Sequence, residues 1–140
     1  MGCCHERKVV VAEKAPKPIG PYSVAIQAGQ FVFVSGQIGL DPATGQIVDG
    51  GVEAETRQAI TNLKNALQAA QLELENVVRT TVYLRDMKDF ERMNAVYAEF
   101  FTDEPPARST IQVAGLPRGG AVEIDVIALS PHNECQCCTE

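Results

Sequence analysis

The chain lacks the residues on which most hydrolytic enzymes depend. No histidine and no cysteine occurs between Glu6 and Pro131, and the sequence has no tryptophan. This absence excludes from the body of the chain a Ser/His triad, a Cys/His pair and a zinc site of thiolates and imidazoles. A Walker loop, a G-x-S-x-G elbow and an H-E-x-x-H helix are also missing. Catalysis here would need arginine, carboxylates, hydroxyl groups, backbone and water.

Long apolar runs and clusters of positive charge are missing too. No run approaches the ~20 apolar residues that span a bilayer, and the first residues have no apolar signal-peptide core. We therefore expect a cytoplasmic protein that does not enter a membrane. The 12 Lys and Arg against 18 Asp and Glu give a net charge of −6. Because a phosphate backbone is repelled by such a field, the charge argues against a nucleic-acid partner.

The five cysteines lie only near the two ends of the chain. We interpret residues 1–6 and 131–140 as tails, and residues 7–130 as one domain that folds without disulfides. A plain disordered or added tail competes with lipidation, with metal binding and with disulfides between molecules. "CCTE" is a poor prenylation box, and C-x-C-C lacks paired C-x-x-C spacing, so a metal site is only a weak alternative. The cysteines are Cys3, Cys4, Cys135, Cys137 and Cys138.

The hydrophobic pattern predicts an α+β fold in the order β-β-β-α-β-α-β-β. Apolar residues at helical spacing predict helices over residues 52–72 and after Asp86 or Asp89, the second with Phe90, Met93 and Tyr97 on its apolar face. Runs of β-branched residues and turn signals predict the strands. The expected strands cover residues 7–13, 22–27, 31–35, 77–84, 108–114 and 121–129.

Several strands are apolar on both sides, which two helices cannot cover. The runs "VVV" at residues 9–11 and "FVFV" at residues 31–34 place apolar side chains at both parities of a strand. Two helices cover one face of one six-stranded sheet, and strands that are apolar on both sides are usually covered on both. We therefore expect another copy of the chain against the second face.

Two charged residues on core strands are candidates for a binding or catalytic site. Arg108 begins its strand beside no charged neighbour, and its planar guanidinium suits a carboxylate. Glu123 lies on a mostly apolar strand face. From the residues alone, a structural ion pair or an exposed strand end is the simpler explanation of either residue. If the last two strands form a hairpin, Arg108 and Glu123 are neighbours in one site or in one ion pair.

Two hydroxyl residues at the ends of strands are weaker candidates. Tyr22 follows "IGP" where a loop enters a strand, and Ser35 precedes Gly36 where a strand enters a long loop. Tyr22 could equally be part of the core wall, and Ser35 could satisfy a turn.

Five segments together are similar to one known family. "KAPKPIGPYS", "FVFVSGQIGLDPATGQI", "VVRTTVYLRDM", "MNAVYAEFF" and "PARSTIQVAGLPRGGAVEIDVIAL" resemble the Rid (reactive intermediate deaminase, YjgF) family in its RidA branch. The resemblance runs from about Val9 to Leu129. P-A-R-S followed by V-E-I at this distance is its most specific part. It implies a chorismate-mutase-like chain, with two helices on one face of a six-stranded mixed sheet, that assembles as a homotrimer with ligand sites between subunits.

The resemblance also implies an activity and a set of site residues. Rid proteins hydrolyse 2-imino acids, formed from enamines such as 2-aminoacrylate, to 2-keto acids and ammonia without metal or cofactor. Typical substrates are 2-iminopropanoate and 2-iminobutanoate. The family's carboxylate-binding arginine falls on Arg108 and its water-assisting acid on Glu123. Thr110 stands where many members have cysteine, which leaves no thiol chemistry at this position. The remaining positions implied to bind substrate are Tyr22, Ser35, Gly36, Asn94 and Thr110.

Two other functions stay open for a sequence of this kind. Some members of the family are described as translation inhibitors or ribonucleases, although the acidic charge and the missing histidine argue against this activity here. A binding or chaperone-like protein would hold a carboxylate ligand without turnover.

Overall fold

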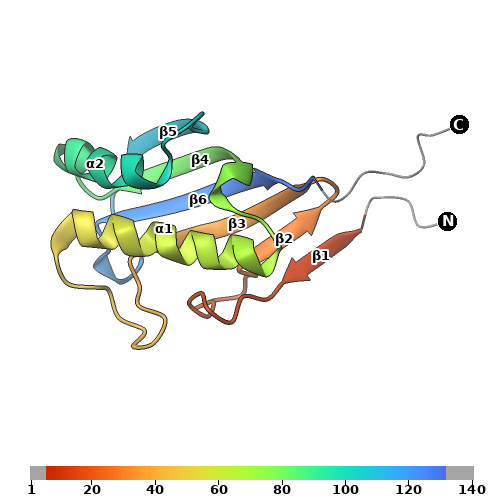
Figure 1. The fold of residues 1–140 in the computed structure, drawn as a ribbon. Coiled ribbons are helices and arrows are strands. Elements are labelled where there is room, and N and C mark those ends of the chain that lie inside the picture. The colour runs from red at the N-terminus through yellow and green to blue at the C-terminus, as the bar shows by residue number, and fades with distance from the viewer. Residues whose placement is uncertain (1–5, 132–140) are drawn as a thin grey trace, which may run out of the picture.

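The computed structural model describes residues 6–131. The interpretations placed on the cysteines of the two tails lie outside the described residues. Within residues 6–131 the chain forms the predicted α+β order, β-β-β-α-β-α-β-β. Figure 1 shows the two helices lying side by side across one face of the sheet. The elements are β1 (Arg7–Val10), β2 (Ala25–Ala28), β3 (Phe31–Ile38), α1 (Gly51–Ala69), β4 (Val77–Leu84), α2 (Phe90–Phe100), β5 (Ala107–Gln112) and β6 (Val122–Leu129), with short 3-10 turns at Leu74–Asn76, Met87–Asp89 and Pro117–Gly119.

Local chemistry explains where several elements begin and end. The strand β4 has the predicted bounds. Ahead of α2, the Asp86 carboxylate accepts a hydrogen bond from the Lys88 amide, as a capping residue does. The helix α1 ends earlier than predicted because Gln71 adopts a left-handed backbone with φ of 63°. The strand β3 runs three residues further than predicted, because it resumes pairing with β6 after a bulge between Val34 and Gln37.

The six strands form one mixed sheet in the order β1-β2-β3-β6-β4-β5. The strands β4 and β5 are parallel and are joined through α2, as a parallel pair requires, while all other pairs are antiparallel. The last two strands are therefore not a hairpin, because β4 lies between them. This order places β5 at one edge of the sheet and β1 at the other (Figure 1).

One face of the sheet packs against the helices and forms the hydrophobic core. Along β6, Val122, Ile124 and Val126 point toward the helices and are buried. The predicted stripe of α1 faces them, and Ile60, Leu63 and Leu67 are fully buried. Burying side chains of this size contributes about 1.5–3 kcal/mol each. This face holds the fold together.

The other face of the sheet carries apolar side chains that the described chain leaves exposed. Phe31 pairs with Leu129 across β3 and β6, and Phe33 pairs with Ile127. Phe31, Phe33 and Leu129 are each more than 40% exposed. Large apolar side chains that stay exposed on one sheet face favour an interaction surface there. We call the residues Val9, Phe31, Phe33, Ile111 and Leu129 the open face; they agree with the expected homo-oligomer, which remains a prediction.

Neither helix of the described residues could cross a membrane. Over residues 6–131 no helix is both long enough and apolar enough to span a bilayer.

Candidate functional site

Glu123 lies in a pocket on the side of the sheet away from the helices. It alternates along β6 with the buried Val122 and Ile124, so its carboxylate points to the opposite face. Burial, and then the negative charge of Asp125, raise the pKa of Glu123 above its ordinary value of 4.5. Within residues 6–131 this carboxylate forms no ion pair. Such a group suits proton transfer near neutral pH better than an ordinary glutamate does.

Gly36 lets the carboxylate of Glu123 reach the end of β3. A Cβ atom at position 36 would lie only 2.1 Å from Oε1 of Glu123, a separation that real Cβ atoms do not show. The close approach follows from the bulge between Val34 and Gln37, which turns this part of β3 toward β6. Glycine at this position is therefore required by the carboxylate beside it.

Ser35 and Tyr22 complete the polar lining of the same pocket. The Ser35 hydroxyl donates a 2.6 Å hydrogen bond to the carbonyl of Ser23, so it ties β3 to the chain before β2. The Tyr22 hydroxyl accepts a 3.2 Å hydrogen bond from the amide of Ile19, and the ring is 46% exposed. Both hydroxyl groups thus have a structural partner and still keep hydrogen-bonding capacity for a ligand.

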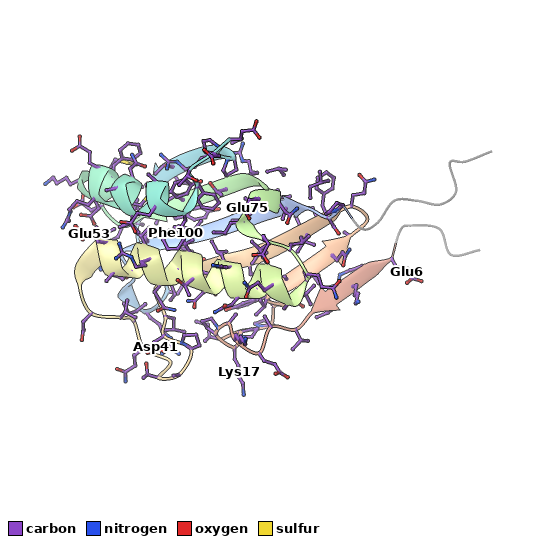
Figure 2. The ribbon with its side chains drawn as sticks, in the orientation of Figure 1. Glu6, Lys17, Asp41, Glu53, Glu75 and Phe100 are labelled. Carbon is purple, nitrogen blue, oxygen red and sulfur yellow. The ribbon has the colours of Figure 1, made fainter. Side chains whose placement is uncertain are left out.

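More residues line this pocket than the sequence candidates alone suggest. It has a volume of about 330 Å³. We call it the Glu123 pocket. Figure 2 shows Lys17, one of its lining residues, on the loop after β1, along the edge of the molecule that lies opposite α2. Most of the residues that the sequence analysis missed are apolar or come from these loops, and no motif distinguishes them from ordinary loop residues. The missed residues are Pro16, Lys17, Ile19, Val24, Gln37, Ile38, Leu40 and Pro117.

Arg108 lies at the opposite edge of the sheet, against α2. Its guanidinium carbon is 4.7 Å from the ring centroid of Tyr97 and 5.7 Å from that of Phe90. The 2.8 Å hydrogen bond between the Tyr97 and Thr80 hydroxyls holds the nearer ring in place. Within residues 6–131, Arg108 forms no ion pair, so the structural salt bridge considered from the sequence is absent there. Cation–π contacts orient a guanidinium without neutralising it.

Two buried polar atoms without partners lie on the elements that hold Arg108. Asn94 is four residues after Phe90 and three before Tyr97, so it shares the helix face that contacts Arg108. Thr110 follows Arg108 by two residues and shares its strand face. Among the described residues, Oδ1 of Asn94 and Oγ1 of Thr110 are buried and have no hydrogen-bond partner. We call Arg108, Asn94 and Thr110 the Arg108 edge.

The Glu123 pocket and the Arg108 edge lie on opposite faces of one sheet. Arg108 pairs with Thr80, a buried residue on the helix-covered face, whereas Glu123 pairs with Tyr83 on the other face. The strand β4 separates the two, and one chain cannot bring the two side chains together across it. They are therefore neither an ion pair nor one complete site within a single chain.

Each part has its own chemical capacity. The Arg108 edge offers an unneutralised guanidinium beside an amide and a hydroxyl, which together suit a planar carboxylate with neighbouring polar groups. The Glu123 pocket offers a carboxylate with a raised pKa in a mostly apolar cavity, which suits water activation and proton transfer.

Comparisons with known proteins agree on one family. The family model described as endoribonuclease L-PSP matches residues 12–130. A mouse protein named 2-iminobutanoate/2-iminopropanoate deaminase is 51% identical over 123 residues, which are 88% of this chain and 91% of that protein.

Solved structures give the same result. A Yersinia pestis structure titled as a member of the conserved Rid protein family has a TM-score of 0.86 at 38% identity, and the match covers 89% of this chain and 99% of that one. The structure of Escherichia coli TdcF with bound serine has a TM-score of 0.82 at 39% identity and covers 87% and 98% of the two chains.

Proposed function

The chain belongs to the Rid family, and from this premise we propose that it hydrolyses 2-imino acids to 2-keto acids and ammonia. The single observation that carries the proposal is the unneutralised guanidinium of Arg108, held by two aromatic rings beside two unpartnered buried polar atoms. A 2-imino acid has a carboxylate next to an electrophilic C=N carbon, so a residue that fixes the carboxylate also places that carbon. The mouse relative named as such a deaminase supports the same reaction.

The site would be built from two subunits of a homotrimer. Arg108 and Glu123 lie on opposite faces of one chain, and the open face offers an apolar surface for a second copy. A cyclic arrangement brings the Arg108 edge of each subunit against the Glu123 pocket of the next and repeats the same contact three times. Each interface would then contain one complete site, and three sites would form per trimer.

The reaction follows from the groups on the two parts. Arg108, with Asn94 and Thr110, would hold the carboxylate of the imino acid. Glu123 would orient a water molecule and take one of its protons as the water oxygen bonds to the imine carbon. The first proton passed to nitrogen gives the neutral carbinolamine. A second proton, taken from the carbinolamine hydroxyl and passed to nitrogen, lets the C–N bond break as the C=O bond forms, which releases ammonia and leaves the keto acid. Since imines hydrolyse unaided in water, positioning and one proton-transfer group are adequate.

The ligand in one similar solved structure is consistent with this arrangement. The Escherichia coli TdcF structure contains serine, an amino acid with a carboxylate and an adjacent nitrogen. A 2-imino acid has the same carboxylate and a nitrogen on the same carbon. By analogy, the Arg108 edge of this chain would bind the carboxylate of such a ligand.

The test is the appearance of keto acid while an amino-acid oxidase or threonine dehydratase generates imine. The purified protein should accelerate this step, and Arg108→Ala should lower kcat/KM by about 100-fold or more, since the guanidinium that would bind the substrate carboxylate is lost. Arg57→Ala is the matched control, because Arg57 is an exposed arginine that pairs with Glu99 away from both parts of the site. No acceleration by the wild-type protein, or full activity in Arg108→Ala, would refute the proposal.

RNA cleavage is the second candidate, favoured by the description of the matching family model. The net charge of −6 and the absence of histidine from residues 6–131 weigh against it. Salt-sensitive RNA cleavage that copurifies with the protein and is lost in Glu123→Gln would support it.

A further inference from the structure

A buried carboxyl group on α1 holds the chain segment that leads into β6. Glu55 is only 7% exposed, although it is a charged residue type that is rarely buried. Its Oε1 accepts a 2.8 Å hydrogen bond from the backbone amide of Ala121, which is itself 2% exposed. A buried amide without an acceptor is costly, so the two groups depend on each other.

The fold makes room for this contact at the end of β3. A Cβ atom at Gly39 would lie 2.6 Å from the Cα atom of Glu55, so only glycine lets α1 approach β3 this closely. The approach places the carboxyl group of Glu55 within reach of the loop between β5 and β6. The contact between Glu55 and Ala121 is therefore fixed by close packing of backbone against backbone at Gly39.

Ala121 lies between two residues that line the Glu123 pocket. Pro117 precedes it by four residues and Glu123 follows it by two, and both face the cavity. The carbonyl of Ala121 accepts a 3.0 Å hydrogen bond from the amide of Arg85, so this residue is held on both sides of its backbone. A shift at Ala121 would move the pocket wall and the carboxylate together.

The other side-chain hydrogen bonds of this loop are exposed to solvent, and one of them joins Nη1 of Arg118 to the carbonyl of Gly45 at 3.2 Å. Nη1 of Arg85 donates a 2.6 Å hydrogen bond to the carbonyl of Gly119 at the exposed surface. The hydrogen bond from Ala121 to Glu55 is the buried side-chain contact that this loop makes within the described residues. Buried hydrogen bonds fluctuate less than exposed ones, so this contact is the one suited to set the position of the loop.

We propose that Glu55 is a positioning residue for the deaminase reaction, acting through Ala121 to hold Glu123 and Pro117 in place. This inference rests on the proposed function of the Glu123 pocket. Glu55 touches neither the pocket nor a substrate, and its effect is to keep the Glu123 carboxylate within reach of the water that it orients. Displacement of a catalytic group by about 1 Å can lower a rate by about 100-fold.

Three variants test the proposal. Glu55→Gln keeps a side-chain oxygen that can accept from Ala121, whereas Glu55→Met has similar length and no such acceptor. Glu55→Ala is measured beside Glu55→Met, in case one of them does not fold. Glu53→Ala is the control, because Glu53 lies on the same helix, is half-buried and forms its ion pair with Arg92 away from Ala121. Kinetics are measured only for variants that circular dichroism shows to be folded at the assay temperature.

The expected result is a decrease in kcat of about 10- to 100-fold in Glu55→Met and Glu55→Ala, with KM within about twofold because Arg108 still binds the carboxylate. Glu55→Gln and Glu53→Ala should stay within about twofold of the wild type. A lower melting temperature in the folded Glu55→Met protein together with wild-type kcat would overturn the proposal, since a purely structural role predicts that outcome.

A measurement that does not depend on turnover separates this inference from the proposed function. The titration of the Glu123 carboxyl carbon is followed by NMR in the wild type and in Glu55→Met. Loss of the anchor should let Glu123 move into solvent, which lowers its pKa because burial is the main cause that raises it. If the wild type proves not to be a deaminase, the proposed function fails, and an unchanged Glu123 titration would then overturn the role of Glu55 as well.

Discussion

Replacement of Gly36 by alanine should damage catalysis far more than stability. The added Cβ would lie 2.1 Å from Oε1 of Glu123, whereas real Cβ contacts stay beyond 3.0 Å, so the carboxylate must withdraw by at least 0.9 Å. The atoms that must move, Oε1 and Cδ of Glu123, are at the far end of a flexible side chain, and the backbone of Gly36 is not in the left-handed region. The free energy of unfolding should therefore change by less than about 1 kcal/mol.

A displacement of this size has a large effect on a reaction that depends on position. About 1 Å of misplacement corresponds to a decrease of about 100-fold in kcat/KM, or about 2.7 kcal/mol of transition-state stabilisation. The assay is keto-acid appearance with enzymatically generated 2-iminobutanoate, and chemical denaturation is measured in parallel. Gly115→Ala is the matched control, because a Cβ atom at position 115 meets nothing within 4 Å. Wild-type kcat/KM in folded Gly36→Ala would refute the role given to Glu123.

Three further changes test separate parts of the account. Asp125→Asn removes a negative charge that raises the pKa of Glu123, so Glu123 should ionise at lower pH and the acid limb of the kcat/KM profile should move to lower pH. Phe33→Glu places a charge on the open face and should convert the assembly to monomers in light scattering, with loss of activity. Tyr97→Phe leaves the buried Thr80 hydroxyl without its partner and should lower the free energy of unfolding by about 1 kcal/mol in urea, while the ring still contacts Arg108.

The raised pKa of Glu123 also gives stability a defined pH dependence. The folded state favours the protonated carboxyl group, since burial and then Asp125 disfavour its charge. The contribution of Glu123 to stability is thus fully present below its unfolded pKa, near 4.5, and is lost as pH rises through the higher folded value. In Glu123→Gln this part of the pH dependence of unfolding should disappear.

The elements could be predicted from the sequence in segments whose apolar residues follow a single helix or strand periodicity. The β-branched run of β4 and the apolar stripe of α1 each fit a single pattern, and both elements form as expected. The extension of β3 was missed because the bulge after Val34 depends on pairing with β6, which lies about 90 residues away in the chain. The order of the strands also depends on long-range pairing, and local patterns do not encode it.

The candidate site was only partly visible in the sequence. Side-chain alternation places Arg108 and Ser109 on opposite faces of β5, but alternation within one strand does not show whether Arg108 and Glu123, on two different strands, share a face. The support of Arg108 by Phe90 and Tyr97 was missed, because these aromatic residues fit the apolar face of a helix and need no other explanation. The clash that Gly36 avoids arises only in three dimensions.

The most direct test of the central claim mixes two variants that each lack one half of the site, Arg108→Ala and Glu123→Gln. After equimolar subunit exchange, three quarters of the trimers contain both variants, and each of these has one intact site in three if Arg108 and Glu123 come from neighbouring subunits. The account predicts recovery of about one quarter of wild-type kcat/KM in the mixture. Complete absence of recovery, with mixed trimers shown by native mass spectrometry, would contradict a site shared between subunits.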